Sequence, residues 1–253
     1  RATKVVPGFS DAARVHMVEA SQTLRDHQKR TLGGLDVMWH DDISTLPDLP
    51  LYLVANEFFD ALPTRQFMRD AGGWRERHVG LIAGKLRLGL SAPAPISALT
   101  DRLADTAAGD IVEISAAARN VMNGLSQRIS QFGGAAIVID YGDWQSLGDT
   151  FQAVHNHRVA DPMASPGDAD LSAHVDFCAL AQSAPEVLAT DMVPQGVLLE
   201  RLGITARAQA LAHKLTGPEL GAHISAQRRL THPDEMGTLF KAIAFHPVGT
   251  PPP

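Results

Sequence analysis

The chain has 253 residues, of which 45% are hydrophobic and 20% are charged, and its formal net charge is −6. This composition supports a folded core and excludes global disorder, and the negative charge disfavours nonspecific binding to nucleic acid. The single cysteine, Cys178, excludes an internal disulfide framework and a cysteine-based zinc site. No apolar run approaches the roughly 20 residues of a membrane span, and no secretory signal is visible. We therefore expect no membrane insertion and a reducing compartment, either the bacterial cytoplasm or, alternatively, the mitochondrial matrix.

The first two predicted strands are each followed by an acidic residue. Residues 14–19 read as a short strand ending in Glu19, and Ser21 can cap the helix that follows. Residues 35–39 read as the next strand, followed closely by Asp41. In Rossmann-like sheets an acid at the end of the second strand, the place predicted for Glu19, accepts hydrogen bonds from ribose hydroxyls. The alternative is an ordinary solvated acid at the end of a strand or a helix cap.

The stretch LYLVANEFFDALP, residues 51–63, is the most informative part of the chain. Residues 51–55 form an apolar run without polar alternation, which predicts a strand buried on both faces of a mainly parallel sheet. Asn56, Glu57 and Asp60 follow directly. The carboxyl ends of such strands are where open α/β sheets bind ligands, so these polar residues are site candidates. The alternative is a strand-to-helix turn with Asn and Asp as caps.

Residues 64–90 change character and predict an antiparallel β meander inserted into, or lying beside, the parallel sheet. Short strand-like pieces at residues 66–68, 74–79 and 85–90 are separated by glycine-containing turns.

A second wholly apolar strand, residues 135–139, ends in Asp140 and Tyr141. If this strand is the neighbour of the first apolar strand in a parallel sheet, Asp140 should lie near Asn56 and Glu57. The short strand at residues 110–114 precedes an amphipathic helix, and for Glu113 and Arg119 at its start we expect a solvated ion pair.

Several ligand-type side chains occur between residues 155 and 176: His155, His157, His174 and Asp176. Their spacing does not match a helical metal motif, so we expect no metal site. Ser172 is predicted to cap the next helix, which would place Asp176 in its first turn, a structural role.

Residues 171–246 are predicted to be a largely helical C-terminal part. Apolar residues recur at helical spacing in residues 205–215 and 218–230. Residues 239–245 could instead finish as a strand of the sheet.

Several of these motifs occur together in one known family. NEFFDALP (residues 56–63), GDTFQAV (148–154) and HVDF (174–177) resemble, in order and spacing, the MidA-like family of class I S-adenosylmethionine-dependent methyltransferases, and VEAS (18–21) resembles its second-strand motif. The family includes a mitochondrial assembly factor that methylates an arginine in a subunit of respiratory complex I.

The resemblance implies an α/β fold with a Rossmann-like, mainly parallel twisted sheet flanked by helices, formed by one methyltransferase domain over residues 1–253. It implies S-adenosyl-L-methionine as the co-substrate, with no metal, and cofactor-binding roles for Glu19, Asp41 and Asn56. It also implies a partner protein as the substrate, with a complex I subunit as one candidate.

Carboxylates suit this chemistry because they hold a planar guanidinium by paired, charge-assisted hydrogen bonds and can take up the proton that leaves. Our hypothesis gives catalytic roles to three residues: Glu57 holds the substrate cation, Asp60 shapes the loop, and Asn56 fixes the cofactor or the substrate nitrogen. The residues expected to contact the substrate are Glu57, Asp140, Tyr141 and His174.

The chain departs from the family pattern at its beginning. The glycine-rich turn that grips the cofactor after the first strand is absent, as are the helices that precede it. We therefore expect the native protein to contain residues before Arg1.

Two other functions compete with methyl transfer. Strands ending in acids also fit a nicotinamide-dependent oxidoreductase, although no Tyr-x-x-x-Lys or other hydride-transfer motif occurs. A degenerate methyltransferase acting as a non-catalytic assembly scaffold is the third possibility, and the presence of Asn56, Glu57 and Asp60 disfavours it.

Overall fold

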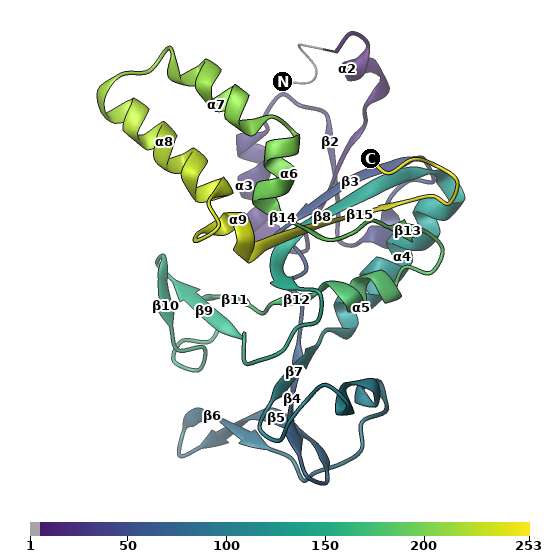
Figure 1. The fold of residues 1–253 in the computed structure, drawn as a ribbon, viewed down its shortest axis with the longest axis vertical. Coiled ribbons are helices and arrows are strands. Elements are labelled where there is room, and N and C mark those ends of the chain that lie inside the picture. The colour runs from purple at the N-terminus through teal and green to yellow at the C-terminus, as the bar shows by residue number, and fades with distance from the viewer. Residues whose placement is uncertain (1–5) are drawn as a thin grey trace. The chain divides into compact units, whose positions relative to one another are not determined.

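The computed structural model describes residues 6–253, and the chain divides into two compact units, Arg1–Leu49 and Pro50–Pro253. Figure 1 shows the elements of both. The single-domain assignment made from the sequence stays a prediction. Among residues 6–253, no helix has both the length and the apolar character needed to cross a lipid bilayer.

The first unit contains a small parallel sheet. Strand β1 (Val15–Val18) pairs in parallel with β2 (Val37–His40), and the helix α3 (Gln22–Thr31) connects them. The hydroxyl of Ser21 accepts a hydrogen bond from the backbone N–H of Leu24 at 3.3 Å, so the predicted cap is confirmed. The other elements of this unit are α2 (Phe9–Ala12) and the 3-10 helix η1 (Ile43–Thr45).

The second unit is built on a mixed sheet around β8 (Gly134–Asp143). Strand β3 (Leu51–Asn56) pairs with β8 in parallel, and β15 (Phe240–His246) pairs with it antiparallel on the other side. The short β12 (Val175–Asp176) continues in parallel beside the last residues of β8. Two further short strands, β13 (Leu188–Ala189) and β14 (Val193–Pro194), pair with β15. The α/β fold class with a Rossmann-like parallel core is thus confirmed. The alternative prediction of a strand at residues 239–245 is also confirmed, because β15 lies there.

Strand β3 exists as predicted, but it is not buried on both faces. Tyr52 and Val54 are 82% and 70% exposed, and Ala55 is its one buried residue. Among residues 6–253, β8 is the only strand hydrogen-bonded to β3, so one edge of β3 is open. The expectation of burial on both faces is therefore wrong for this chain, because an apolar run does not reveal whether other elements cover both faces of the strand.

The core of the second unit lies between this sheet and α4 (Ala116–Phe132). Met122, Leu125 and Ile129 recur at helical spacing and are 0–1% exposed, which gives α4 one buried apolar face. The hydroxyl of Ser115 caps the helix by accepting the N–H of Ala118 at 3.1 Å.

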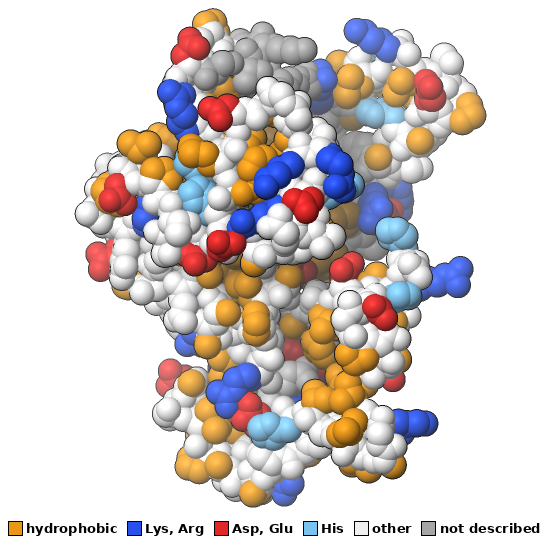
Figure 2. All heavy atoms as spheres, turned by 180° about the vertical axis from the view of Figure 1, so that it is seen from behind, with side chains coloured by type: hydrophobic (Ala, Val, Ile, Leu, Met, Phe, Trp, Pro, Cys, Tyr) orange, Lys and Arg blue, Asp and Glu red, His pale blue; other side chains and the backbone are white. Residues whose placement is uncertain are grey.

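The predicted antiparallel meander is present and gains a fourth strand. The sheet has the order β6 (Lys85–Leu90), β5 (Gly73–Ile82), β4 (Arg65–Asp70) and β7 (Ile111–Ile114). Two 3-10 helices, η2 (Ser97–Leu99) and η3 (Asp101–Leu103), connect β6 to β7. Its core contains four residues that are at most 2% exposed: Phe67, Trp74, Leu99 and Val112. Figure 2 shows hydrophobic side chains at the surface in the lower part of the view, where this sheet lies.

The C-terminal part contains five helices, and a second small sheet, within residues 152–172, largely precedes it in the chain. The helices are α5 (Phe177–Gln182), α6 (Gln195–Arg201), α7 (Ile204–Ala212), α8 (Gly217–Thr231) and α9 (Met236–Leu239). The small sheet has the order β10 (Arg158–Ala160), β9 (Gln152–His155) and β11 (Asp170–Ser172).

Ser172 therefore ends a strand, and the prediction that it caps a helix is wrong. Asp176 is the cap instead, since its carboxylate accepts the N–H of Ala179 at 2.7 Å, so its structural role is confirmed.

Glu113 is buried and not part of a solvated ion pair, contrary to the expectation from the sequence. It is 5% exposed, and its carboxylate accepts hydrogen bonds from the Gln66 side-chain amide at 2.7 Å and from the Thr150 N–H at 3.1 Å. The Thr150 hydroxyl also donates to it and accepts the backbone N–H of His174 at 2.7 Å. Glu113 thus connects β4 and β7 to two segments far along the chain, and one of them carries a candidate site residue.

We expect Glu113→Ala to lower the free energy of unfolding by on the order of 3 kcal/mol, because buried donors of Gln66 and Thr150 lose their charged acceptor. The measurement is urea unfolding followed by circular dichroism. Glu235→Ala is the control, because Glu235 forms an ion pair with Arg228 at 2.9 Å between side chains that are 36% and 56% exposed, and such surface pairs contribute less than about 1 kcal/mol. Equal losses in the two variants would show that Glu113 has no special structural role.

Candidate active site

The carboxyl ends of β3 and β8 meet, as predicted. Asn56 lies opposite Ile139 in the register, and the N–H of Glu57 donates to the Ile139 carbonyl at 3.1 Å. The Asp140 carboxylate accepts the N–H groups of Phe59 at 3.0 Å and Asp60 at 3.2 Å with one oxygen. Its other oxygen accepts the N–H of Tyr141 at 2.9 Å. Asp140 therefore fastens the loop that follows β3 to the end of β8.

Glu57 and Asn56 are exposed at this junction. Glu57 has a φ of 51°, in the left-handed region that residues other than glycine seldom adopt. The Asn56 side-chain amide donates to the Glu57 carboxylate at 3.1 Å. The Glu57 carboxylate is thus held at the end of the strand with acceptor capacity left for a ligand.

Asp60 and Asp140 are buried, at 8% and 0% exposure. Burial first, and then the neighbouring charge of Glu57, raises the pKa of Asp60 to about 6. Burial, and then the charge of Asp60, raises the pKa of Asp140 to about 7. One oxygen of Asp60, Oδ1, is buried and has no hydrogen-bond partner among the described residues. A buried acceptor without a donor indicates a place where a donor group can bind.

Tyr141 lies where these carboxylates converge. Its ring packs against Phe240, with 4.1 Å between ring centroids, and stacks on His174 at 6.4 Å and 12°. Burial, followed by the charges of Glu57, Asp60 and Asp140, raises the pKa of the Tyr141 phenol. All four candidate residues predicted to contact the substrate, namely Glu57, Asp140, Tyr141 and His174, therefore belong to one neighbourhood.

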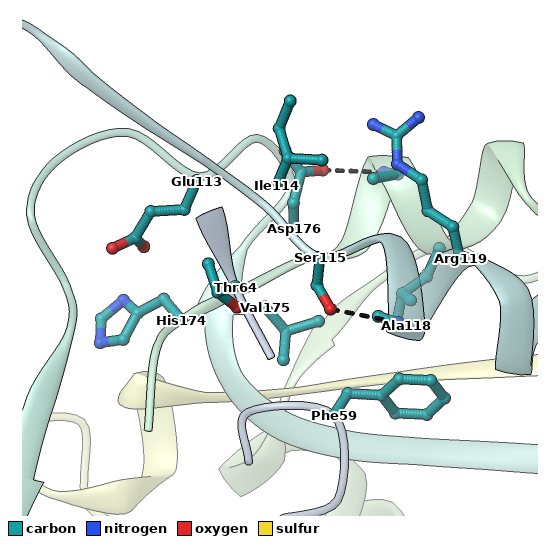
Figure 3. Close-up of a pocket in the computed structure, with 12 residues that line it drawn as sticks. Phe59, Thr64, Glu113, Ile114, Ser115, Ala118, Arg119, His174, Val175 and Asp176 are labelled. Carbon is teal, nitrogen blue, oxygen red and sulfur yellow. Dashed lines mark hydrogen bonds between the residues drawn. The ribbon is translucent and has the colours of Figure 1, made fainter. Parts of the chain in front are cut away.

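A small cavity of about 30 Å³ lies behind His174, among the end of β7, the start of α4 and the loop after β3 (Figure 3). This volume suits about one water molecule. Figure 3 shows Glu113 and His174 on one side of the cavity and Phe59 on the other. Burial is the main cause that lowers the pKa of His174. The cavity is too small for a substrate.

A single glycine, Gly142, allows β12 to approach β8 closely, and His174 directly precedes β12. Gly142 has a φ of 150°, and a Cβ at this position would lie 2.1 Å from the Val175 carbonyl oxygen. Since no side chain fits, the close approach of β12 to β8 requires glycine.

The two remaining cofactor candidates lie in the first unit. Each Glu19 carboxylate oxygen accepts one hydrogen bond, from the Ser21 N–H at 2.9 Å and from the Gln28 side chain at 3.2 Å. Each oxygen keeps a free lone pair, so Glu19 fits a role as acceptor for ribose hydroxyls. Asp41 is exposed and forms an ion pair with Arg25 at 2.6 Å. Among residues 6–253 no group of three or more His, Cys, Asp and Glu side chains could hold a metal ion.

Sequence reasoning missed two features of the site. It treated Glu113 as solvated, although a buried acid between Val112 and Ile114 interrupts an otherwise apolar strand, and this was the available signal. It also assigned no role to Arg229, whose positive charge counteracts the rise in the Tyr141 pKa. Arg229 lies in an amphipathic helix, and nothing in its local sequence distinguishes it from an ordinary solvated side chain.

Known proteins resemble this chain over most of its length. "Protein arginine methyltransferase NDUFAF7, mitochondrial" from Xenopus laevis is 32% identical over 92% of this chain and 59% of its own length. The Homo sapiens protein of that name is 32% identical over 92% of this chain and 58% of its own length. A crystal structure from Burkholderia thailandensis with S-adenosyl-homocysteine bound is 28% identical, with a TM-score of 0.78 over 92% of this chain and 64% of that one. The chain thus spans less than two thirds of the length of these relatives.

The family described as "Putative S-adenosyl-L-methionine-dependent methyltransferase" matches residues 1–193, about three quarters of the chain. This match agrees with the resemblance carried by the sequence motifs and with the fold shared with the Burkholderia protein. The chain therefore belongs to this family of S-adenosyl-L-methionine-dependent methyltransferases.

Proposed function

We propose that the protein to which this chain belongs transfers a methyl group from S-adenosyl-L-methionine to an arginine side chain of a partner protein. The observation that carries the proposal is the convergence of Glu57, Asp60 and Asp140 on Tyr141, at the joined ends of two parallel strands. The names of the relatives, which are protein arginine methyltransferases, support the same chemistry.

The three carboxylates suit a cationic substrate. A guanidinium is protonated in water at almost any pH and presents several N–H donors in one plane. We assign to Glu57 the paired hydrogen bonds that hold and orient it, because the Glu57 carboxylate is exposed and already fixed by Asn56. The unpartnered Oδ1 of Asp60 is a further acceptor for such a donor. Asp60 thus has a second possible role beside shaping the loop.

Methylation of a guanidinium releases one proton, because the methylated product keeps a single positive charge. Bound S-adenosyl-L-methionine supplies the methyl group as a sulfonium. Asp60, whose pKa is about 6, is a suitable acceptor for the proton near neutral pH. Asp140 instead stabilises the loop through its three backbone hydrogen bonds.

Glu19, Asp41 and Asn56 are proposed to hold the cofactor, with Glu19 accepting ribose hydroxyls and Asp41 the adenine amino group. S-adenosyl-homocysteine bound to the Burkholderia relative supports a cofactor of this class. The identity of the protein substrate as a complex I subunit, and the location in a bacterial cytoplasm or a mitochondrial matrix, stay predictions.

We expect Glu57→Gln in the full-length protein to lower kcat/KM for methyl transfer to an arginine peptide by roughly 100-fold. The glutamine amide cannot form the charge-assisted pair with the guanidinium, and a 100-fold loss corresponds to about 2.7 kcal/mol. Methylated peptide is measured by mass spectrometry, and affinity for S-adenosyl-homocysteine by calorimetry.

The control is Glu219→Gln, which neutralises an exposed glutamate in the first turn of α8 and should leave the rate unchanged. Wild-type turnover in Glu57→Gln would refute the assignment of Glu57. Cofactor binding without methyl transfer to any arginine peptide in the wild-type protein would favour the scaffold function.

The buried acids also predict how stability depends on pH. Asp60 and Asp140 bind protons more tightly in the folded chain than in the unfolded chain, where the pKa is 3.8. Their contribution to the free energy of unfolding is therefore fully present below pH about 4 and is lost as the pH rises through about 6 and about 7. We expect Asp60→Asn to remove much of this pH-dependent loss in the free energy of unfolding. The variant should therefore be more stable than the wild type at alkaline pH by on the order of 2 kcal/mol.

Urea unfolding at several pH values measures the effect. Asp168→Asn is the control because Asp168 is exposed. If wild type and Asp60→Asn lose stability equally between acidic and alkaline pH, Asp60 is not a buried proton-binding group.

A further inference from the structure

An open hollow of about 570 Å³ adjoins the candidate active site on the side of the C-terminal helices. Tyr141 near the end of β8 forms part of its wall, and residues of α8, α9 and the turn between them form the rest. Figure 1 shows where these elements lie in the chain. Arg229, Asp234 and Glu235 contribute charged groups to the wall, and Met236 and Leu239 contribute apolar ones. The wall of the hollow therefore combines apolar side chains with a few charged ones, as surfaces that bind polypeptides do.

Tyr141 connects this hollow to the carboxylates. Its phenol experiences the negative charges of Glu57, Asp60 and Asp140 and the positive charge of Arg229. A substrate side chain that reaches the carboxylates from the hollow must therefore pass within the field of Arg229.

Arg229 is a cation in this wall that is not paired with a carboxylate. Within residues 6–253 it has no ion pair or hydrogen-bond partner, whereas the adjacent Arg228 pairs with Glu235 at 2.9 Å. The Asp234 carboxylate is 86% exposed and lies 3.7 Å from His232. An arginine substrate approaching Arg229 is repelled unless the substrate also brings a negative charge to it.

Building on the proposed function, we propose that the hollow binds the polypeptide flanking the target arginine and that Arg229 selects segments with an acidic side chain a few residues from it. The target guanidinium binds at Glu57, the acidic side chain pairs with Arg229, and neighbouring apolar side chains pack on Met236 and Leu239. Arg229 is a specificity residue and has no part in the chemical step.

The test uses short peptides with one central arginine and with Glu, Gln or Lys at each nearby position, added to full-length protein loaded with S-adenosyl-homocysteine. Calorimetry measures binding, and a parallel assay with S-adenosyl-L-methionine measures methylation. We expect the wild type to bind the best Glu peptide about fivefold more tightly than its Gln counterpart, the size of an exposed ion pair. In Arg229→Glu the preference should invert toward Lys.

Arg207→Glu is the matched control, because Arg207 is exposed on α7 and does not line the hollow. An unchanged preference in Arg229→Glu, or an equal change in Arg207→Glu, overturns the inference. Weaker binding of S-adenosyl-homocysteine by Arg229→Glu also overturns it, since Arg229 would then hold the carboxylate of the cofactor. Failure of every peptide to bind overturns it as well.

The two proposals fail separately. Peptides that bind with the Arg229-dependent acidic preference but are not methylated support this inference and contradict the proposed function. Peptides that are methylated on arginine without that preference support the proposed function and contradict this inference.

Discussion

The carboxylate of Asp140 is the group on which the candidate site depends. It is completely buried and accepts three backbone N–H groups, two from the loop after β3 and one from its own strand. A buried carboxylate is unfavourable unless it is hydrogen-bonded, so this geometry permits few alternatives. By fixing the N–H groups of Phe59 and Asp60, Asp140 sets the path of the loop. That path leaves Glu57 exposed at the strand end and turns Asp60 inward.

A second buried carboxylate holds the opposite side of the site. Glu113 accepts the Thr150 hydroxyl and N–H, and the same hydroxyl accepts the backbone N–H of His174. His174 in turn stacks on Tyr141, and the Tyr141 ring also packs against Phe240 of β15. The tyrosine ring is thus confined between elements that are distant in sequence. The site therefore combines a packed Tyr141 ring with an exposed Glu57 carboxylate, an arrangement that suits the holding of a ligand in one orientation.

The sequence was sufficient to predict which strand ends meet, because parallel strands place the acids that directly follow them at the same edge of the sheet. Asp140 and Glu57 lie together for this reason. The exposure of Tyr52 and Val54 could not be predicted, because an apolar run does not show whether another element covers the face on which they lie. The burial of Glu113 was equally hidden, because its partners Gln66 and Thr150 lie 47 and 37 residues away.

The charges of the site indicate what kind of ligand completes it. Among residues 6–253 no Lys or Arg forms an ion pair with Glu57, Asp60 or Asp140 within 4 Å. No neighbouring cation therefore offsets the repulsion among the three carboxylates. Burial first, and then this repulsion, raises the pKa of both Asp60 and Asp140. A neutral ligand would leave the repulsion in place, whereas a guanidinium would relieve it and donate to the free oxygen of Asp60. This arrangement of charges supports the proposal of a cationic substrate, on grounds separate from the similarity to known proteins.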